Sequence, residues 1–150
     1  MSEGGVRVPP WSAWVSKRPT VVLHARCHLR QILDAFGASA RSHTMRVTGL
    51  GEFRLKASRG IKGGALIAEV LHLGMLLPIH RVEVEASVVT PRSPDLCAVV
   101  VTCTAGVREP RVSTNVSGML DDAVRRVEAS GVPVEVAGWY ATPAEALAAM

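Results

Sequence analysis

The chain has 150 residues, of which 48% are hydrophobic and 20% charged, and its formal net charge is +4. A chain of this length and composition forms one domain with a self-sufficient core, which excludes an intrinsically disordered protein. Its three cysteines cannot all pair, which argues against a disulfide-stabilised secreted domain and indicates a cytoplasmic location.

Hydrophobic periodicity predicts strands and helices after an N-terminal arm. Residues 1–19 contain three prolines, so we expect a loose arm held by Trp11 and Trp14, and residues 20–150 form a single domain. The predicted elements, in chain order, are a strand at 20–26, a helix beginning near residue 29, a hairpin at 45–56 with its turn at 49–51, a helix at 64–77, strands at 81–89 and 96–104, a helix with its apolar stripe at 116–127, a strand at 134–139 and a short helix after Thr142.

The order of these elements predicts the fold class. From Phe53 to about residue 140 the order is strand, helix, strand, strand, helix, strand. This is the ferredoxin-like arrangement, an antiparallel sheet with helices on one face. We therefore predict an α/β two-layer sandwich whose ferredoxin-like portion covers about residues 53–140, preceded by an N-terminal strand-helix extension.

The helix predicted at 64–77 is apolar nearly all round. Such a helix is buried on several sides, so we expect the chain to form a homo-oligomer through it. The apolar stretch is shorter than the ~20 residues that a bilayer requires, and we expect no membrane partner. Glu69 and His72 lie one turn apart on this helix, as either an acid/base pair or a hydrogen-bonded pair in a subunit interface.

A turn rich in glycine and cations, residues 59–65, precedes this helix. Glycines let the backbone approach a ligand, and the N–H groups of a helix N-terminus favour an anion. The turn lacks a Ser or Thr after its lysine, so it is not a P-loop. We predict anion contacts here, with a plain solvated turn as the alternative. The predicted contacts are Arg59, Lys62, Gly63, Gly64 and Ala65.

The hairpin at 45–56 has a basic face. Residues 1–80 carry eleven Arg and Lys against four acidic residues, whereas residues 81–150 carry six against nine. The hairpin cations Arg46 and Arg54 could contact the anionic ligand or the phosphates of RNA. Proteins that bind single strands usually add stacking aromatic side chains, which this face lacks, so a solvated or subunit-contacting face is the alternative.

His24, Cys27 and His28 form the tightest cluster of possible metal ligands. Cys27 activated by His24 could serve as a nucleophile if the N-terminus of the following helix lowered the thiol pKa. The alternative is a purely structural role. Zinc sites prefer paired short ligand spacings, and no second pair has this spacing, so we expect no metal and no cofactor.

The run from Gly63 to Thr102 resembles the ACT-type regulatory domain. The resembling residues are the sequence GGALIAEVL, which opens a helix at 63–71, the strand at 82–90 and the apolar strand at 98–102. The resemblance extends over about residues 53–130. It implies a ferredoxin-like fold, copies that pair side by side, and a small effector such as an amino acid held near Lys62, Gly63, Gly64 and Ala65.

The sequence thus favours a self-associating small-molecule-binding or regulatory module that recognises an anionic ligand at residues 59–65. One alternative is a small oligomeric enzyme with a pocket at a subunit boundary, which uses Cys27 and His24, or His72 and Glu69. A second alternative is an RNA-binding or ribonucleoprotein component that uses the basic hairpin 45–56. The residues do not identify the ligand.

Overall fold

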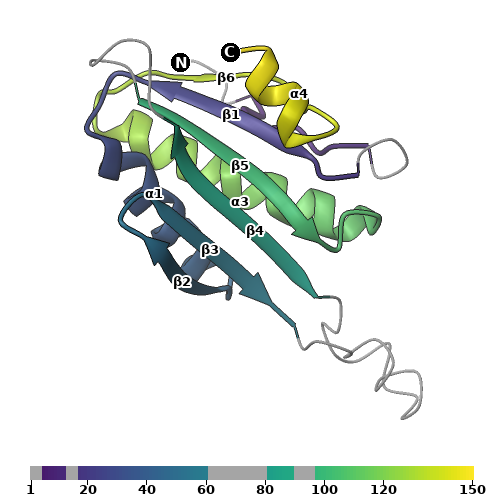
Figure 1. The fold of residues 1–150 in the computed structure, drawn as a ribbon. Coiled ribbons are helices and arrows are strands. Elements are labelled where there is room, and N and C mark those ends of the chain that lie inside the picture. The colour runs from purple at the N-terminus through teal and green to yellow at the C-terminus, as the bar shows by residue number, and fades with distance from the viewer. Residues whose placement is uncertain (1–4, 13–16, 61–80, 90–96) are drawn as a thin grey trace, which may run out of the picture.

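The computed structural model describes residues 5–12, 17–60, 81–89 and 97–150. Six strands form one antiparallel sheet in the order β2-β3-β4-β5-β1-β6, and α1 and α3 lie together on one face of it (Figure 1). The elements are β1 Thr20–Ala25, α1 Leu29–Ser42, β2 Arg46–Gly51, β3 Arg54–Arg59, β4 Val82–Val89, β5 Cys97–Ala105, α3 Pro110–Ala129, β6 Val134–Val136 and α4 Pro143–Ala148.

The predicted ferredoxin-like sandwich is confirmed, but different elements build it. The ferredoxin-like order is followed by β1, α1, β4, β5, α3 and β6, with the strands arranged β6-β1-β5-β4. β2 and β3 form an inserted hairpin that extends the sheet beyond β4. The strand and helix that were expected as an N-terminal extension therefore supply an interior strand and one of the two packed helices. β1 pairs with both β5 and β6, which places it inside the sheet.

The main core lies between the sheet and the helices α1 and α3. Alternate residues of β1, β4 and β5 point toward these helices, as the period of a strand requires. The predicted apolar stripe of α3 is confirmed, because Val116, Leu120 and Val127 are all buried against the sheet and α1. The helix predicted at 64–77 lies outside the described residues and stays a prediction.

The opposite face of the sheet is covered over part of its area by α4. Ala146 is fully buried there against Val22 of β1 and Val100 of β5. Thr142 caps the helix by accepting the Glu145 N–H at 3.3 Å, and Pro143 occupies the first turn, as the sequence predicts. The prediction of a ferredoxin-like pair of helices on one face holds for α1 and α3, whereas α4, whose face the sequence did not assign, covers the other face. The two longer helices leave the other face free for it.

The inserted hairpin differs from its prediction in its turn. β2 continues through Gly51 with an irregularity between Gly49 and Gly51, and the turn lies at residues 52–53 rather than at 49–51. Gly49 and Gly51, which were expected in the turn, instead flank this irregularity, as glycines do at a β-bulge. The predicted alternation is confirmed, since Ala57 faces the core and Lys56 faces away from it.

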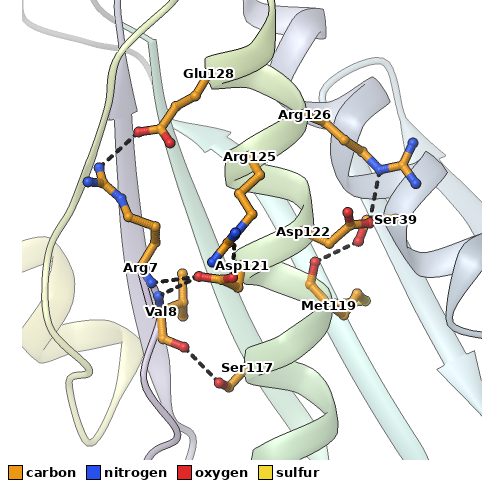
Figure 2. A network of polar contacts seen from close by, with 10 residues as sticks. All are labelled: Arg7, Val8, Ser39, Ser117, Met119, Asp121, Asp122, Arg125, Arg126 and Glu128. Atoms are coloured by element: carbon orange, nitrogen blue, oxygen red, sulfur yellow. Dashed lines mark hydrogen bonds and ion pairs between the residues drawn. The ribbon is translucent and has the colours of Figure 1, made fainter. Parts of the chain in front are cut away.

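The N-terminal arm is docked along α3 over residues 5–12, and Figure 2 shows Arg7 and Val8 beside this helix. Ser117 Oγ donates to the Val8 carbonyl at 2.7 Å, and Ser113 Oγ donates to the Trp11 carbonyl at 2.8 Å. Asp121 accepts the Val8 N–H at 3.3 Å. These three helix residues are four apart and share one face, so they satisfy the backbone of an extended segment. Trp11 anchors the arm as predicted, and residues 5–12 are packed rather than loose; Trp14 lies outside the described residues.

Candidate functional site

The predicted ligand-binding arginines lie on opposite sides of the sheet. Arg46 and Arg54 lie on the face opposite α1 and α3, where Arg54 pairs with Glu85 at 3.3 Å. Arg59, at the end of β3, lies on the helix side and contacts the residues that follow α1. The remaining predicted contacts lie outside the described residues. These are Lys62, Gly63, Gly64 and Ala65.

The basic face of the hairpin is largely neutralised by β4. Lys56 forms an ion pair with Glu83, which also accepts from Arg81 Nη2 at 2.9 Å. The hydrogen bond from Lys56 lowers the pKa of Glu83 against the opposing effect of burial, and this carboxylate stays ionised at neutral pH. Two hairpin cations, Lys56 and Arg54, therefore already face carboxylates. This arrangement leaves less uncompensated positive charge for a nucleic acid than the hairpin sequence suggests.

His24 and Cys27 face different surroundings. Cys27 packs against the main core and exchanges a hydrogen bond with the Cys97 thiol, and burial raises its pKa. A nucleophilic cysteine needs the opposite shift, so this environment disfavours the catalytic role considered for Cys27. His24 lies between two core-facing residues of β1 and points to the other face of the sheet. The second candidate pair, His72 and Glu69, lies outside the described residues.

Arg59 lines a cavity of about 210 Å³ at the place where three elements end or begin. The end of α1 contributes His43 and Thr44, and α3 contributes Asn115. The apolar walls of the cavity are Met45, Val82 and Val116. The cavity thus combines one guanidinium, an imidazole, a hydroxyl and an amide above an apolar floor. This mixture is typical of a pocket that orients a small polar ligand.

The guanidinium of Arg59 has spare hydrogen-bonding capacity. Nη1 donates to the His43 carbonyl at 3.4 Å and to Thr44 Oγ1 at 3.3 Å, and both contacts are long. Within the described part of the chain, Nε is enclosed without a hydrogen-bond partner, and no carboxylate forms an ion pair with Arg59. An arginine offers five donors. Arg59 therefore holds the end of α1 and keeps donors for another acceptor.

Thr44 is held in a strained conformation beside Arg59. Its φ of 61° makes it the one non-glycine residue with positive φ among those that the structure describes. A β-branched residue pays about 1–3 kcal/mol for this left-handed geometry. The strained backbone places its hydroxyl between the His43 carbonyl, to which it donates at 2.7 Å, and the Arg59 guanidinium. Strain of this kind is concentrated at functional sites, which makes it a second pointer to this cavity.

The imidazole of His43 is oriented by α1. Its Nδ1 lies 2.8 Å from the Ser39 carbonyl, and because a carbonyl only accepts, Nδ1 carries the hydrogen. The other ring nitrogen, Nε2, then accepts when the ring is neutral and donates when it is protonated. The carboxylate of Asp122 on α3 is bound by Arg126 Nε at 2.9 Å (Figure 2), and against the opposing effect of burial this hydrogen bond lowers the pKa of Asp122. The acidic neighbour of the cavity is therefore already paired.

Comparisons with known proteins assign no role to this cavity. No protein-family model and no curated protein matches the chain, and the resemblance to the ACT-type domain stays a prediction. Among the described residues, no group of three His, Cys, Asp or Glu side chains could hold a metal ion. No helix in this part of the chain has the length and apolar character needed to cross a membrane.

Sequence reasoning found Arg59 and missed its partners. Arg59 stood out because a cation next to glycine follows a predicted strand. His43 and Thr44 directly follow α1, Asn115 lies within α3, and none of the three carries a local signal. Only the packing of α1, α3 and β3 brings them together.

Proposed function

We propose that the protein binds a small anion, through a carboxylate or phosphate group, in the Arg59 cavity and serves as a ligand-binding or regulatory module. The observation that carries this proposal is a guanidinium that lines a cavity without a carboxylate partner among the described residues. A bidentate contact from a guanidinium to a carboxylate or phosphate is strong and directional. Asn115 and Thr44 add uncharged polar groups to the lining of the cavity, which can contact the rest of such a ligand.

The volume of the cavity limits the size of the ligand. A space of about 210 Å³ is below the 300–1,000 Å³ typical of pockets for drug-sized molecules. It corresponds to roughly seven water molecules at ~30 Å³ each. We therefore propose a ligand whose buried part is one anionic group with a short carbon skeleton. Self-association through residues 64–77 remains a separate prediction, which light scattering at micromolar concentration would test.

Calorimetric titration with inorganic phosphate and with acetate tests the proposal. Replacing Arg59 with Gln should weaken binding of the preferred anion roughly 10- to 100-fold, the equivalent of one charge-assisted contact. The matched control is Arg46→Gln, which removes an arginine from the opposite face of the sheet and should leave the affinity unchanged. Equal affinities for the two variants, or no saturable binding of either anion to the wild type, would contradict the proposal.

A second variant separates binding from folding. Arg59 also contacts the end of α1, so its replacement changes stability as well as affinity. Asn115 is exposed on α3, and within the described residues it forms no hydrogen bond with the end of α1. Asn115→Ala should therefore weaken anion binding while the unfolding midpoint stays within experimental error. An unchanged affinity in this variant would place the anion elsewhere.

A further inference from the structure

A second hollow lies at the opposite end of the sheet from the Arg59 cavity. It has a volume of about 570 Å³ and is bounded by the arm, the end of β1 and the start of β6. The strand order places β6 and β1 at one end of the sheet and β3 near the other. The two hollows are therefore separate. We call the second one the β6 groove; its polar lining consists of Arg7, His24, Arg26 and Glu135.

Two opposite charges face this groove. His24 and Glu135 are direct partners in the antiparallel pairing of β1 with β6, so their side chains emerge side by side on one face. Arg26 follows the end of β1 and also lines the groove. Both Arg26 and Glu135 are exposed, and neither side chain forms a hydrogen bond or ion pair within the described residues. A cation and an anion that have no partner among the described residues thus line the same groove.

His24 adds an enclosed polar atom at the same place. Its Nδ1 is shielded from solvent and has no hydrogen-bond partner among the residues that are described. Leaving such an atom unsatisfied is energetically unfavourable, so it favours any arrangement that supplies a partner. A bound ligand or a water held beneath it would do so.

The other charged groups around the groove are already engaged. Arg7 Nη2 donates to the Val134 carbonyl at 2.7 Å and pairs with Glu128 at 2.9 Å (Figure 2). These contacts fix Arg7 as a wall of the groove. They also occupy a backbone carbonyl of β6, the edge strand, and so oppose the addition of a further strand there. The groove therefore favours a small molecule over an extended peptide that would pair with β6.

We propose that the β6 groove binds a small zwitterion, with its anionic group on Arg26 and its ammonium on Glu135. A guanidinium pairs well with a carboxylate, and a carboxylate side chain accepts from an ammonium group. A ligand with only one charge would leave either Arg26 or Glu135 without a partner. The volume of the groove lies within the usual range for small-molecule sites and accommodates a ligand of dipeptide size.

Titration with glycylglycine followed by NMR tests this proposal. The single-charge controls are N-acetylglycylglycine, which lacks the ammonium, and glycylglycinamide, which lacks the carboxylate. Wild-type protein should bind glycylglycine saturably in the millimolar range or tighter, and each control should bind at least roughly tenfold more weakly, as expected for one lost charge-assisted contact. Both Arg26→Gln and Glu135→Gln change exposed side chains, so the fold should persist.

The two variants give crossed predictions. Arg26→Gln should weaken glycylglycine but leave the weak binding of glycylglycinamide unchanged, because that control has no carboxylate for Arg26. Glu135→Gln should weaken glycylglycine but leave N-acetylglycylglycine unchanged. Arg59→Gln should affect neither, which separates this site from the proposed anion cavity. The proposal is overturned if glycylglycine does not bind, if neither groove variant weakens it, or if each variant weakens both controls equally.

Discussion

Glu83 tests how ion pairs stabilise the face of the sheet that lies opposite α1 and α3. It is 9% exposed, forms an ion pair with Lys56 and accepts from Arg81 at 2.9 Å. The substitution Glu83→Gln keeps the shape of the side chain and removes its charge. On the same strand, Glu85 pairs with Arg54 at 3.3 Å in a more exposed position, so Glu85→Gln is the matched control.

The expected loss of stability follows from the exposure of the partners. A hydrogen bond to a charged group contributes about 1.5–3 kcal/mol. The Lys56 and Arg81 side chains are 30% and 40% exposed, so water solvates their charges when Glu83 is neutralised and offsets part of the lost free energy. We therefore expect Glu83→Gln to lower the free energy of unfolding by about 1–3 kcal/mol, and Glu85→Gln by about 0–1 kcal/mol.

The pH dependence provides an independent check. The hydrogen bond from Lys56 lowers the pKa of Glu83 in the folded protein, so the stabilisation is complete above the ordinary glutamate pKa of about 4.3. It is lost as the pH falls through the lowered folded-state pKa, because the unfolded chain binds the proton more readily. The difference between wild type and Glu83→Gln should therefore shrink in acid.

Urea unfolding followed by tryptophan fluorescence at neutral pH and at successively lower pH measures both quantities. The reasoning fails if Glu83→Gln is no more destabilising than Glu85→Gln at neutral pH. It also fails if the difference between Glu83→Gln and wild type is the same at every pH.

Two further predictions concern backbone space and thiol reactivity. Gly106 has a φ of +80°, and a Cβ there would lie 2.8 Å from the Arg81 carbonyl oxygen, so Gly106→Ala should cost roughly 2–4 kcal/mol of unfolding free energy. Gly118→Ala meets open space on α3 and should instead stabilise by up to about 1 kcal/mol, and thermal unfolding compares the two. Burial raises the pKa of Cys27, and that of Cys103 to about 12, so iodoacetamide at neutral pH should alkylate Cys27 more slowly than free cysteine and Cys103 more slowly still. Faster alkylation of Cys27 than of free cysteine would refute this account.

Most of the fold class was predictable because it depends on local periodicity. The apolar stripe of α3 and the alternation of β4 each mark one buried face, and the apolar run of β5 marks a strand that is buried on both faces. The position of β1 was not predictable in this way. A strand that is apolar on several positions fits equally well at the end of a sheet or inside it, and only pairing with β5 and β6 decides. The position of α4 was not predictable either, because nothing in its short sequence indicates which face of the sheet it covers.

The candidate site was predictable only in part. Arg59 could be selected because cations and glycines at a strand end are a local pattern. The positive φ of Thr44 could not, since threonine rarely adopts it and nothing nearby in the sequence demands it. The pairing of Glu83 with Lys56 and of Glu85 with Arg54 was also hidden, because the predicted basic face was considered without the neighbouring strand.

The docking of the arm has a consequence for how the chain folds during synthesis. Trp11 and Val8 are held by Ser113 and Ser117, which are 102 and 109 residues later in the chain. A ribosome that adds roughly 5–20 residues per second exposes these two side chains for several seconds before α3 emerges. During this interval the nascent protein carries a bare tryptophan-containing segment, which makes it a natural substrate for chaperones that shield apolar peptides.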